Sequence, residues 1–358
     1  MAAMPRIVAP TDAALDELCA QLREASAVLE EPRAWPARQL QWCAAAGVHE
    51  WFLPTAVGGQ GWSEADLLHG YWKLSAACLT TAFILTQRVG ACTRIAASNN
   101  ALAIERLLPP LLRGEIFATI GISQLTTSRQ HVRPVLQARE TASGFELTGY
   151  SPWVTGAEHA QSIVLGATFE DRRQALIALP TDLPGVRIPH APELVSLTAS
   201  RTGPVYCDGV HVSRDWLLAG PVENVMKQGL GAKTGGLQTS TLAAGLSTAA
   251  VDFLDDQSQQ RDVFTRPAAA LRSELNDLLS DLFALAGGEQ PCAAEEARSR
   301  ANSLALRTTQ AALVAAKGAG FVAGHPAGRW CREALFFLVW SCPPAATSAN
   351  LCEFAGIQ

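Results

Sequence analysis

The stretch GFELTGYSPWVTGA, residues 144–157, decides how the fold is interpreted. In it, Phe145 and Leu147 alternate with polar neighbours, which is typical of a half-buried strand. Short apolar runs separated by turns follow at residues 162–165, 175–179 and 205–207. Because no helical pattern stands between these runs, they predict an antiparallel sandwich or barrel over residues 118–222. No GxGxxG motif follows a predicted strand, so the sequence does not predict a Rossmann site.

Helical patterns flank this β-rich centre on both sides. Apolar residues recur at helical spacing between residues 15 and 29, and Ser63 followed by Asp66 is typical of a helix start. Leucines repeat at helical spacing again between residues 271 and 285. We therefore predict an α+β protein with an N-terminal helical domain (residues 1–117), a central antiparallel β-domain (118–222) and a C-terminal four-helix bundle (223–358).

The composition argues against several classes of partner. The 358-residue chain has a net charge of −5 and no basic block, so we expect no nucleic acid. The longest apolar run, residues 334–340, is too short to cross a bilayer, and the first six residues lack the apolar stretch of a signal peptide. Nine cysteines are scattered without metal-type spacing, so we expect reduced thiols, a cytoplasmic location and no metal.

Five segments, in order, resemble motifs of the acyl-CoA dehydrogenase family. They are residues 51–61, 107–115, 144–157, 208–220 and 317–334. The resemblance implies the family's fold and an FAD-dependent oxidoreductase. Such an enzyme oxidises a small-molecule substrate, an acyl-CoA or a related acyl thioester, by hydride transfer to flavin N5. The resemblance also implies a homodimer or homotetramer and an electron-transfer partner.

By the same resemblance, Trp153 and Thr155 match the pair that lies against the flavin. An indole plane shields one face of the ring from water, and a hydroxyl beside N5 stabilises the reduced ring. The alternative is a core tryptophan and a strand threonine without such a role. The other positions that the resemblance implies for binding FAD are Gly121, Ser123, Arg261, Phe264, Gly318 and Gly320.

Two arginines are predicted to bind groups other than this chain's own flavin, namely the FAD of a neighbouring subunit and the substrate. Arg261, with Phe264, matches a motif that reaches the FAD diphosphate of a neighbouring subunit, and the guanidinium fork suits a diphosphate. The alternative is an exposed arginine at a helix end. Arg129 stands where the family has a serine that contacts substrate, so we predict a substrate role for it. The alternative there is a solvated loop charge.

The customary catalytic bases are absent. The resemblance aligns Ser341 with the family's usual catalytic glutamate and Gln238 with its second base position. Neither a hydroxyl nor an amide takes a proton from carbon unaided. Three interpretations stay open. The base is another residue, with Glu333 and Glu353 as the nearby carboxylates and the Cys342 thiolate as a further alternative. Otherwise the chain is a flavin-dependent monooxygenase on the same fold, or it is a non-catalytic flavin-binding protein.

Overall fold

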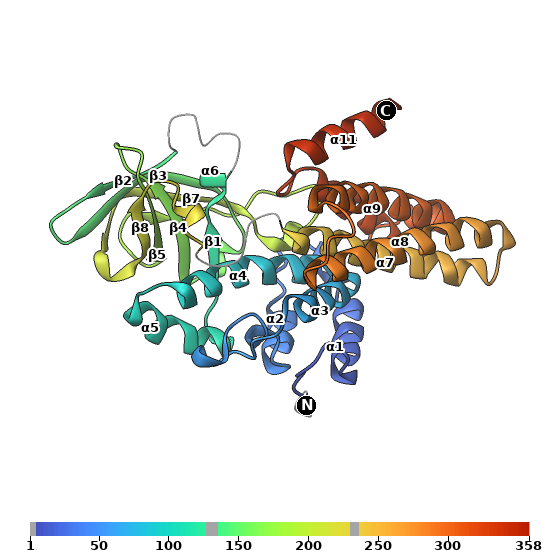
Figure 1. Ribbon diagram of the computed structural model, residues 1–358, viewed down its shortest axis with the longest axis horizontal. Coiled ribbons are helices and arrows are strands. Elements are labelled where there is room, and N and C mark those ends of the chain that lie inside the picture. The colour runs from blue at the N-terminus through green and yellow to red at the C-terminus, as the bar shows by residue number, and fades with distance from the viewer. Residues whose placement is uncertain (1–4, 127–134, 230–235, 358) are drawn as a thin grey trace.

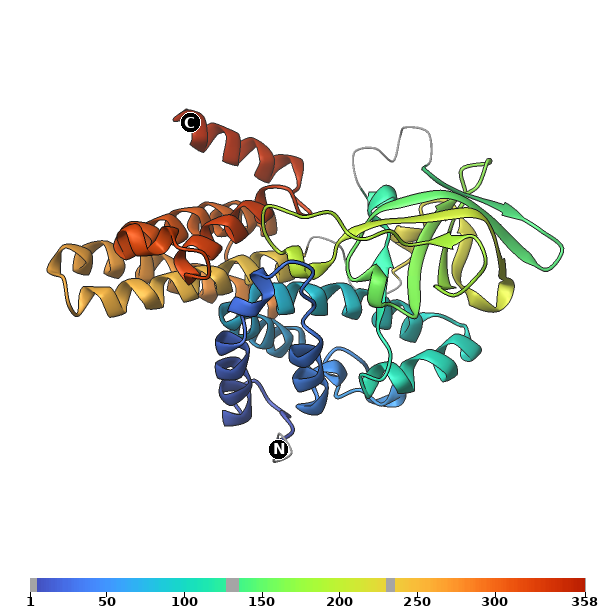
Figure 2. The same cartoon turned by 180° about the vertical axis from the view of Figure 1, so that it is seen from behind.

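The computed structural model describes residues 5–126, 135–229 and 236–357, whose elements form three groups. In Figure 1 the β-domain occupies one end of the molecule and the long C-terminal helices occupy the other. The N-terminal helices lie along one side of both groups, as Figure 2 shows from behind. The predicted α+β class and the order of helices, strands and helices are confirmed.

Five α-helices make up the N-terminal group. They are α1 (Ala13–Glu24), α2 (Ala37–Ala45), α3 (Glu64–Ala77), α4 (Leu79–Ala97) and α5 (Ala101–Leu112). The predicted helix start at Ser63 is confirmed, because its hydroxyl accepts a hydrogen bond of 3.2 Å from the backbone N–H of Asp66. Buried leucines of α1, at positions 15, 18 and 22, form the apolar stripe that the spacing predicted.

The described residues of the centre form one eight-stranded sheet, a single short α-helix, α6 (Ser123–Thr126), and short 3₁₀ turns. The strands are β1 (Ala118–Gly121), β2 (Leu136–Glu140), β3 (Gly144–Val154), β4 (Ser162–Thr168), β5 (Gln174–Pro180), β6 (Val186–Arg187), β7 (Gly203–Ser213) and β8 (Leu217–Val222). The order is β6-β7-β3-β2-β4-β5-β8, and β1 pairs with β4.

The predicted antiparallel pairing is confirmed for most strand pairs, but the sheet is mixed. Strand β1 runs parallel to β4, and β2 meets β4 in a parallel bridge, whereas the other pairs are antiparallel. The chain leaves β1, forms the β2–β3 hairpin and only then returns as β4, and a connection of that length permits parallel pairing. Alternating hydrophobicity identifies strands and their faces, but it does not identify the partner or its direction.

The C-terminal group is built on three long helices, α7 (Leu237–Ser258), α8 (Thr265–Ala286) and α9 (Ala294–Ala316). Two shorter helices, α10 (Pro326–Ala334) and α11 (Pro344–Ala355), pack against α9. A 3₁₀ turn over Leu335–Leu338 lies between them, and Pro343 and Pro344 open the last helix.

A close approach of α3 and α7 joins the N-terminal and C-terminal groups. A Cβ atom placed on Gly245 would lie 2.7 Å from the Cβ of Ser75, so only glycine permits this packing. The hydroxyl of Ser75 donates to the carbonyl of Leu242 at 2.7 Å, and the indole N–H of Trp72 donates to Thr248 at 2.8 Å. No helix within the described part of the chain is long and apolar enough to cross a bilayer.

Candidate functional site

The ends of β1 and β3 are joined by one glutamine. Gln124, in the first turn of α6, donates through Nε2 to the carbonyls of Gly121 at 3.1 Å and Gly166 at 2.6 Å. Its Oε1 accepts from the hydroxyl of Ser151 on β3 at 3.0 Å. Gln124 could not be identified from the sequence, because its three partners come from three separate strands. The bridge brings the predicted positions at residues 121–123 close to the predicted pair at residues 153–155.

The two predicted flavin contacts on β3 differ in exposure. Trp153 is 57% exposed although its strand neighbour Val154 is fully buried, so the indole is displayed rather than packed in the core. Thr155 is 2% exposed, and its hydroxyl lies 2.9 Å from that of Thr202, which lies 2.8 Å from the hydroxyl of Ser200. The interpretation of Trp153 as a core tryptophan is therefore wrong, whereas Thr155 is anchored in a buried chain of hydroxyls.

Ser123, the residue before Gln124, supplies an unpaired polar group. Its hydroxyl oxygen is buried and has no hydrogen-bond partner in the structure. A buried hydroxyl without a partner is unfavourable, and a ligand atom would satisfy it. An exposed indole and an unpaired hydroxyl on two segments that Gln124 links fit a flat, polar-edged ring such as isoalloxazine. Arg129, the predicted substrate contact, lies outside the described residues.

The structure brings together the predicted diphosphate residues at the far end of the C-terminal helices. Arg261 donates to the carbonyl of Ala315 at 2.9 Å, and its guanidinium lies 4.6 Å from the ring centre of Phe264. Ala315 leads directly into the turn that contains Gly318 and Gly320. A Cβ atom on Gly318 would meet nothing within 4 Å, so this turn leaves open space beside it.

This end lies far from the flavin contacts of the same chain. Arg261 follows α7, whose 22 residues extend about 33 Å from the helix start at residue 237. Figure 1 shows the β-domain at the opposite end of the molecule. The surface around Arg261 is apolar and exposed, with exposed fractions of 73% for Val263, 69% for Val314, 85% for Phe321 and 66% for Val322. Such a cluster of exposed apolar side chains is typical of a surface that another protein covers.

The position of Ser341 is fixed by hydrogen bonds to the residues before it and not by its own side chain. It is exposed, and its φ of 45° lies in the left-handed region, where residues other than glycine are uncommon. The preceding carbonyls, of Phe337 and Trp340, accept hydrogen bonds of 3.0 and 2.9 Å from Arg298 on α9. Arg298 is 2% exposed, so these charge-assisted bonds are shielded from water. Arg298 was not predicted from the sequence, although a charged residue directly after Ala297 on an apolar helical stripe is a usable signal.

Aromatic contacts fix the same segment against the N-terminal helices. The ring of Trp340 lies 5.0 Å from that of Phe83 on α4 and 5.1 Å from that of Phe336. Ser341 is therefore positioned at the junction of α4 and α9. Gln238 lies in the first turn of α7, and its buried Nε2 has no hydrogen-bond partner. Among the described residues, Ser341 and Gln238 form no hydrogen bond with each other.

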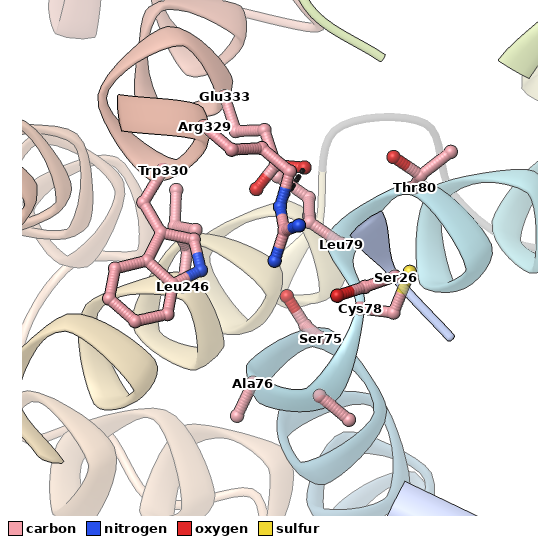
Figure 3. Close-up of a pocket in the computed structure, with 11 residues that line it drawn as sticks. Ser26, Ser75, Ala76, Cys78, Leu79, Thr80, Leu246, Arg329, Trp330 and Glu333 are labelled. Atoms are coloured by element: carbon pink, nitrogen blue, oxygen red, sulfur yellow. Dashed lines mark ion pairs between the residues drawn. The ribbon is translucent and has the colours of Figure 1, made fainter. Parts of the chain in front are cut away.

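Glu333, one of the two alternative bases, lies in a separate cavity of about 10 Å³, which holds about one water molecule. Figure 3 shows Glu333 beside Arg329, with Ser75 and Cys78 across the cavity. An oxygen of Glu333 lies 3.8 Å from the Nε of Arg329. Burial raises the pKa of Glu333 to about 7, although Arg329 opposes that rise. The carboxyl group has the pKa of a general base, but its cavity has no room for an acyl chain.

Glu353, the other alternative, is exposed on α11 and accepts a hydrogen bond of 2.7 Å from Ser303. This bond directs the carboxylate toward the surface of α9. Within the described part of the chain, no group of three or more histidines, cysteines or acidic residues is arranged to hold a metal ion.

Comparisons with known proteins identify relatives in sequence and in fold. No family model matches the chain. The chain is 24% identical over 267 residues to benzylmalonyl-CoA dehydrogenase of Aromatoleum aromaticum, with 72% of this chain and 70% of the relative covered. It is 21% identical over 339 residues to the mitochondrial short-chain specific acyl-CoA dehydrogenase of Bos taurus, with 86% and 80% covered.

A solved structure of similar fold is that of a glutaryl-CoA dehydrogenase from Mycobacterium smegmatis in complex with FADH2. It superposes with a TM-score of 0.80 at 16% identity and covers 97% of this chain and 96% of its own. The structural similarity therefore extends over the helices and the sheet alike.

Proposed function

We propose that this chain, which resembles the acyl-CoA dehydrogenases in sequence and shares their fold as predicted, is an FAD-dependent oxidoreductase that acts on an acyl thioester. The observation that carries the proposal is the site at the ends of β1 and β3. There Gln124, which follows the unpaired buried hydroxyl of Ser123, bonds to Ser151, two residues before the exposed indole of Trp153. Bound FAD supplies a hydride acceptor at this site.

The protein's own residues hold and orient the ring. Trp153 covers one face and excludes water from it, and Ser123 bonds to its polar edge. The backbone N–H groups between Gly121 and Ser123 are further donors to that edge. Thr155, anchored through Thr202, keeps its backbone and hydroxyl in a fixed position beside the ring.

The substrate's carbonyl group needs a donor, and its α-carbon needs a proton acceptor. We assign the donor role to the backbone N–H of Ser341, which Arg298 positions through the two preceding carbonyls. A backbone donor does not depend on the side chain at that position. No carboxylate stands at Ser341 or Gln238, so we expect α-proton transfer to limit the rate.

The apolar surface around Arg261 supports a homodimer or homotetramer. Arg261 and Gly318 are too far along the bundle to serve the same chain's flavin, so we assign them to the FAD diphosphate of a neighbouring subunit. We propose that an electron-transfer protein reoxidises the FAD after each turnover. All nine cysteines are unpaired, which supports a reducing compartment such as the cytoplasm.

The test is an anaerobic titration of the FAD-loaded protein with a panel of acyl-CoA thioesters, followed by visible absorbance. We expect one or more thioesters to bleach the flavin slowly. Ser341→Glu is expected to raise the bleaching rate by about tenfold or more, because a positioned carboxylate supplies the missing base. Gln238→Glu tests the second base position in the same way. Ser348→Glu, on the exposed surface of α11, is the matched control.

Three outcomes would contradict the proposal. A protein that takes up no FAD on reconstitution is not a flavoenzyme. An FAD-loaded protein that no thioester bleaches, but that yields oxygenated product after chemical reduction and admission of O₂, is a monooxygenase. A folded, FAD-loaded Ser341→Glu variant with no gain toward any thioester that the wild type binds would refute the role of that position.

A further inference from the structure

Arg298 is a buried cation with two unpaired nitrogen atoms. Its side chain comes from α9 and is 2% exposed, and its Nη2 donates to the carbonyls of Phe337 and Trp340. Its Nε and Nη1 have no hydrogen-bond partner, and no acidic residue in the described part of the chain forms an ion pair with it. Donors that are removed from water and left without an acceptor are unfavourable, so an acceptor with negative charge is expected beside this guanidinium.

The sulfur of Cys342 lies beside this cation. Burial lowers the pKa of Arg298 to about 10, and the Cys342 sulfur opposes that fall, both through its charge as an anion and as a hydrogen-bond acceptor. Two neutral groups also donate to the same sulfur, the Nδ2 of Asn302 at 3.9 Å and the hydroxyl of Thr347 at 3.5 Å. A guanidinium and two further donors around a sulfur favour the thiolate, which is the nucleophilic form of cysteine.

Asn302 contributes another unpaired group at this place. It is 1% exposed on α9, and its Oδ1 is buried without a hydrogen-bond partner although its Nδ2 bonds to the sulfur. Beside the sulfur there are therefore donors that lack an acceptor, on Arg298, and an acceptor that lacks a donor, on Asn302. The hydroxyl of a sulfenic acid, –S–OH, carries both an acceptor and a donor, so this form of Cys342 would satisfy both groups.

Cys342 is also open to small molecules, because it is partly exposed in the turn between Ser341 and α11. Five other cysteines are buried, and burial raises the pKa of each of their thiols: Cys19, Cys43, Cys78, Cys92 and Cys207. The pKa values of Cys292 and Cys331 are raised as well, in both cases chiefly by desolvation. These seven side chains therefore remain thiols at neutral pH, the form that reacts slowly.

We propose that Cys342 is a site of oxidative modification, at which hydrogen peroxide converts the thiol to a sulfenic acid that Arg298 and Asn302 stabilise. The sulfur attacks one peroxide oxygen, so that an S–O bond forms and the O–O bond breaks. The sulfur loses two electrons to the peroxide, and the leaving hydroxide takes the thiol proton to become water. Cys352, the next cysteine along the chain, lies about 12 Å further along α11, too far to consume the sulfenic acid by forming a disulfide.

The modification lies one residue from Ser341, whose backbone N–H we assign to the substrate's carbonyl group. An oxygen on the Cys342 sulfur competes for the guanidinium that also holds the carbonyls of Phe337 and Trp340. Because this competition loosens the segment that positions Ser341, we expect oxidation to weaken thioester binding. This consequence rests on the proposed function, whereas the oxidation itself does not.

The test locates sulfenic acids in the purified protein with dimedone and peptide mass spectrometry. The reduced chain is exposed to hydrogen peroxide at neutral pH in the presence of dimedone, and adducts are quantified at each cysteine over time. Cys352 is the matched control thiol, because it is partly exposed on α11 and, among the described residues, no side chain donates a hydrogen bond to it. We expect the adduct at Cys342 to form about tenfold faster than at Cys352, because the rate follows the fraction of thiolate and its exposure.

Variants separate the role of the donors from simple exposure. Arg298→Met removes the cation and is expected to slow adduct formation at Cys342 to the rate of Cys352. Exposure alone predicts the opposite change, since a loosened segment uncovers the thiol. Thr347→Val, on the exposed side of α11, removes only a donor and is expected to slow the reaction severalfold. Ser348→Ala, at the next exposed position, is the matched control and should leave the rate unchanged.

Equal adduct formation at Cys342 and Cys352 would refute the modification site. An unchanged or faster reaction in both Arg298→Met and Thr347→Val would refute it as well, because the donors would then play no part.

The consequence for the substrate is measured on the FAD-loaded protein. Thioesters are titrated before and after peroxide treatment, and dissociation constants are taken from the flavin spectrum. We expect the dissociation constant to rise severalfold in the wild type but not in Cys342→Ala. A rise in both proteins, or in neither, refutes the link to Ser341 and leaves the modification site in place. If no thioester perturbs the flavin of the untreated protein, the proposed function fails, and the dimedone result is unaffected.

Discussion

Replacement of Glu333 by glutamine should remove a pH-dependent loss of stability. The pKa of this carboxyl group is about 7 in the folded protein, against 4.5 for an exposed glutamate. The folded state therefore holds the proton more tightly than the unfolded state between these two values. As the pH rises through that window, the unfolded state ionises first and the free energy of unfolding falls.

The magnitude follows from the two pKa values. Because each pKa unit corresponds to about 1.4 kcal/mol, the full difference amounts to about 3 kcal/mol, and most of it is lost between pH 5 and pH 8. Water screens this charge little, because Glu333 is only 4% exposed, so the full free-energy difference applies. Over that range the wild type should lose about 2–3 kcal/mol more unfolding free energy than Glu333→Gln.

The assay is equilibrium unfolding in urea at pH 5, 6, 7 and 8, followed by circular dichroism. Glu105→Gln, an exposed carboxylate on α5, is the control and should show the pH dependence of the wild type. The quantity compared is the change with pH and not the absolute stability. Loss of the Arg329 ion pair in the variant therefore does not obscure the result. If the midpoints of wild type and Glu333→Gln move in parallel from pH 5 to pH 8, the argument for a proton held by Glu333 is refuted.

Three further predictions concern other parts of the molecule. Trp153→Ala should weaken FAD binding by roughly tenfold, because it removes an aromatic face that is 57% exposed and is not needed for the core. The affinity is measured by fluorescence titration, and an unchanged affinity would show that the indole does not contact the flavin. Arg298→Met should accelerate amide hydrogen exchange of residues 335–341, because the carbonyls of residues 337 and 340 lose their donor. The exchange is measured by mass spectrometry, and Arg266→Met, on the exposed surface of α8, is the control that should leave it unchanged. Lys317→Gly should raise the free energy of unfolding by about 1 kcal/mol, because its φ of 55° and ψ of −146° favour glycine; an equal gain from Lys317→Ala would contradict that reason.

The elements that carry the candidate site residues could be predicted, because motif residues are close in sequence to the strands and helices that carry them, whereas the roles of these residues stay predictions. Trp153 and Thr155 come at the end of a strand whose alternation is visible in the sequence, and Gly318 and Gly320 follow a long helical stripe. The same reasoning could not find Gln124 or Arg298, whose partners lie on separate elements. It also left Glu333 open as a base, since spacing along a chain does not show the size of a cavity.

The sequence by itself determined the order of helices and strands, the helix start at Ser63 and the absence of a carboxylate at residues 341 and 238. These features depend on local periodicity, capping and residue identity. Only the tertiary structure decided that β1 runs parallel to β4 and that Glu333 has a pKa of about 7. It alone decided that the guanidinium of Arg298 lies beside the sulfur of Cys342. Strand direction, desolvation and charge compensation depend on neighbours that are distant in sequence, and only folding brings those neighbours together.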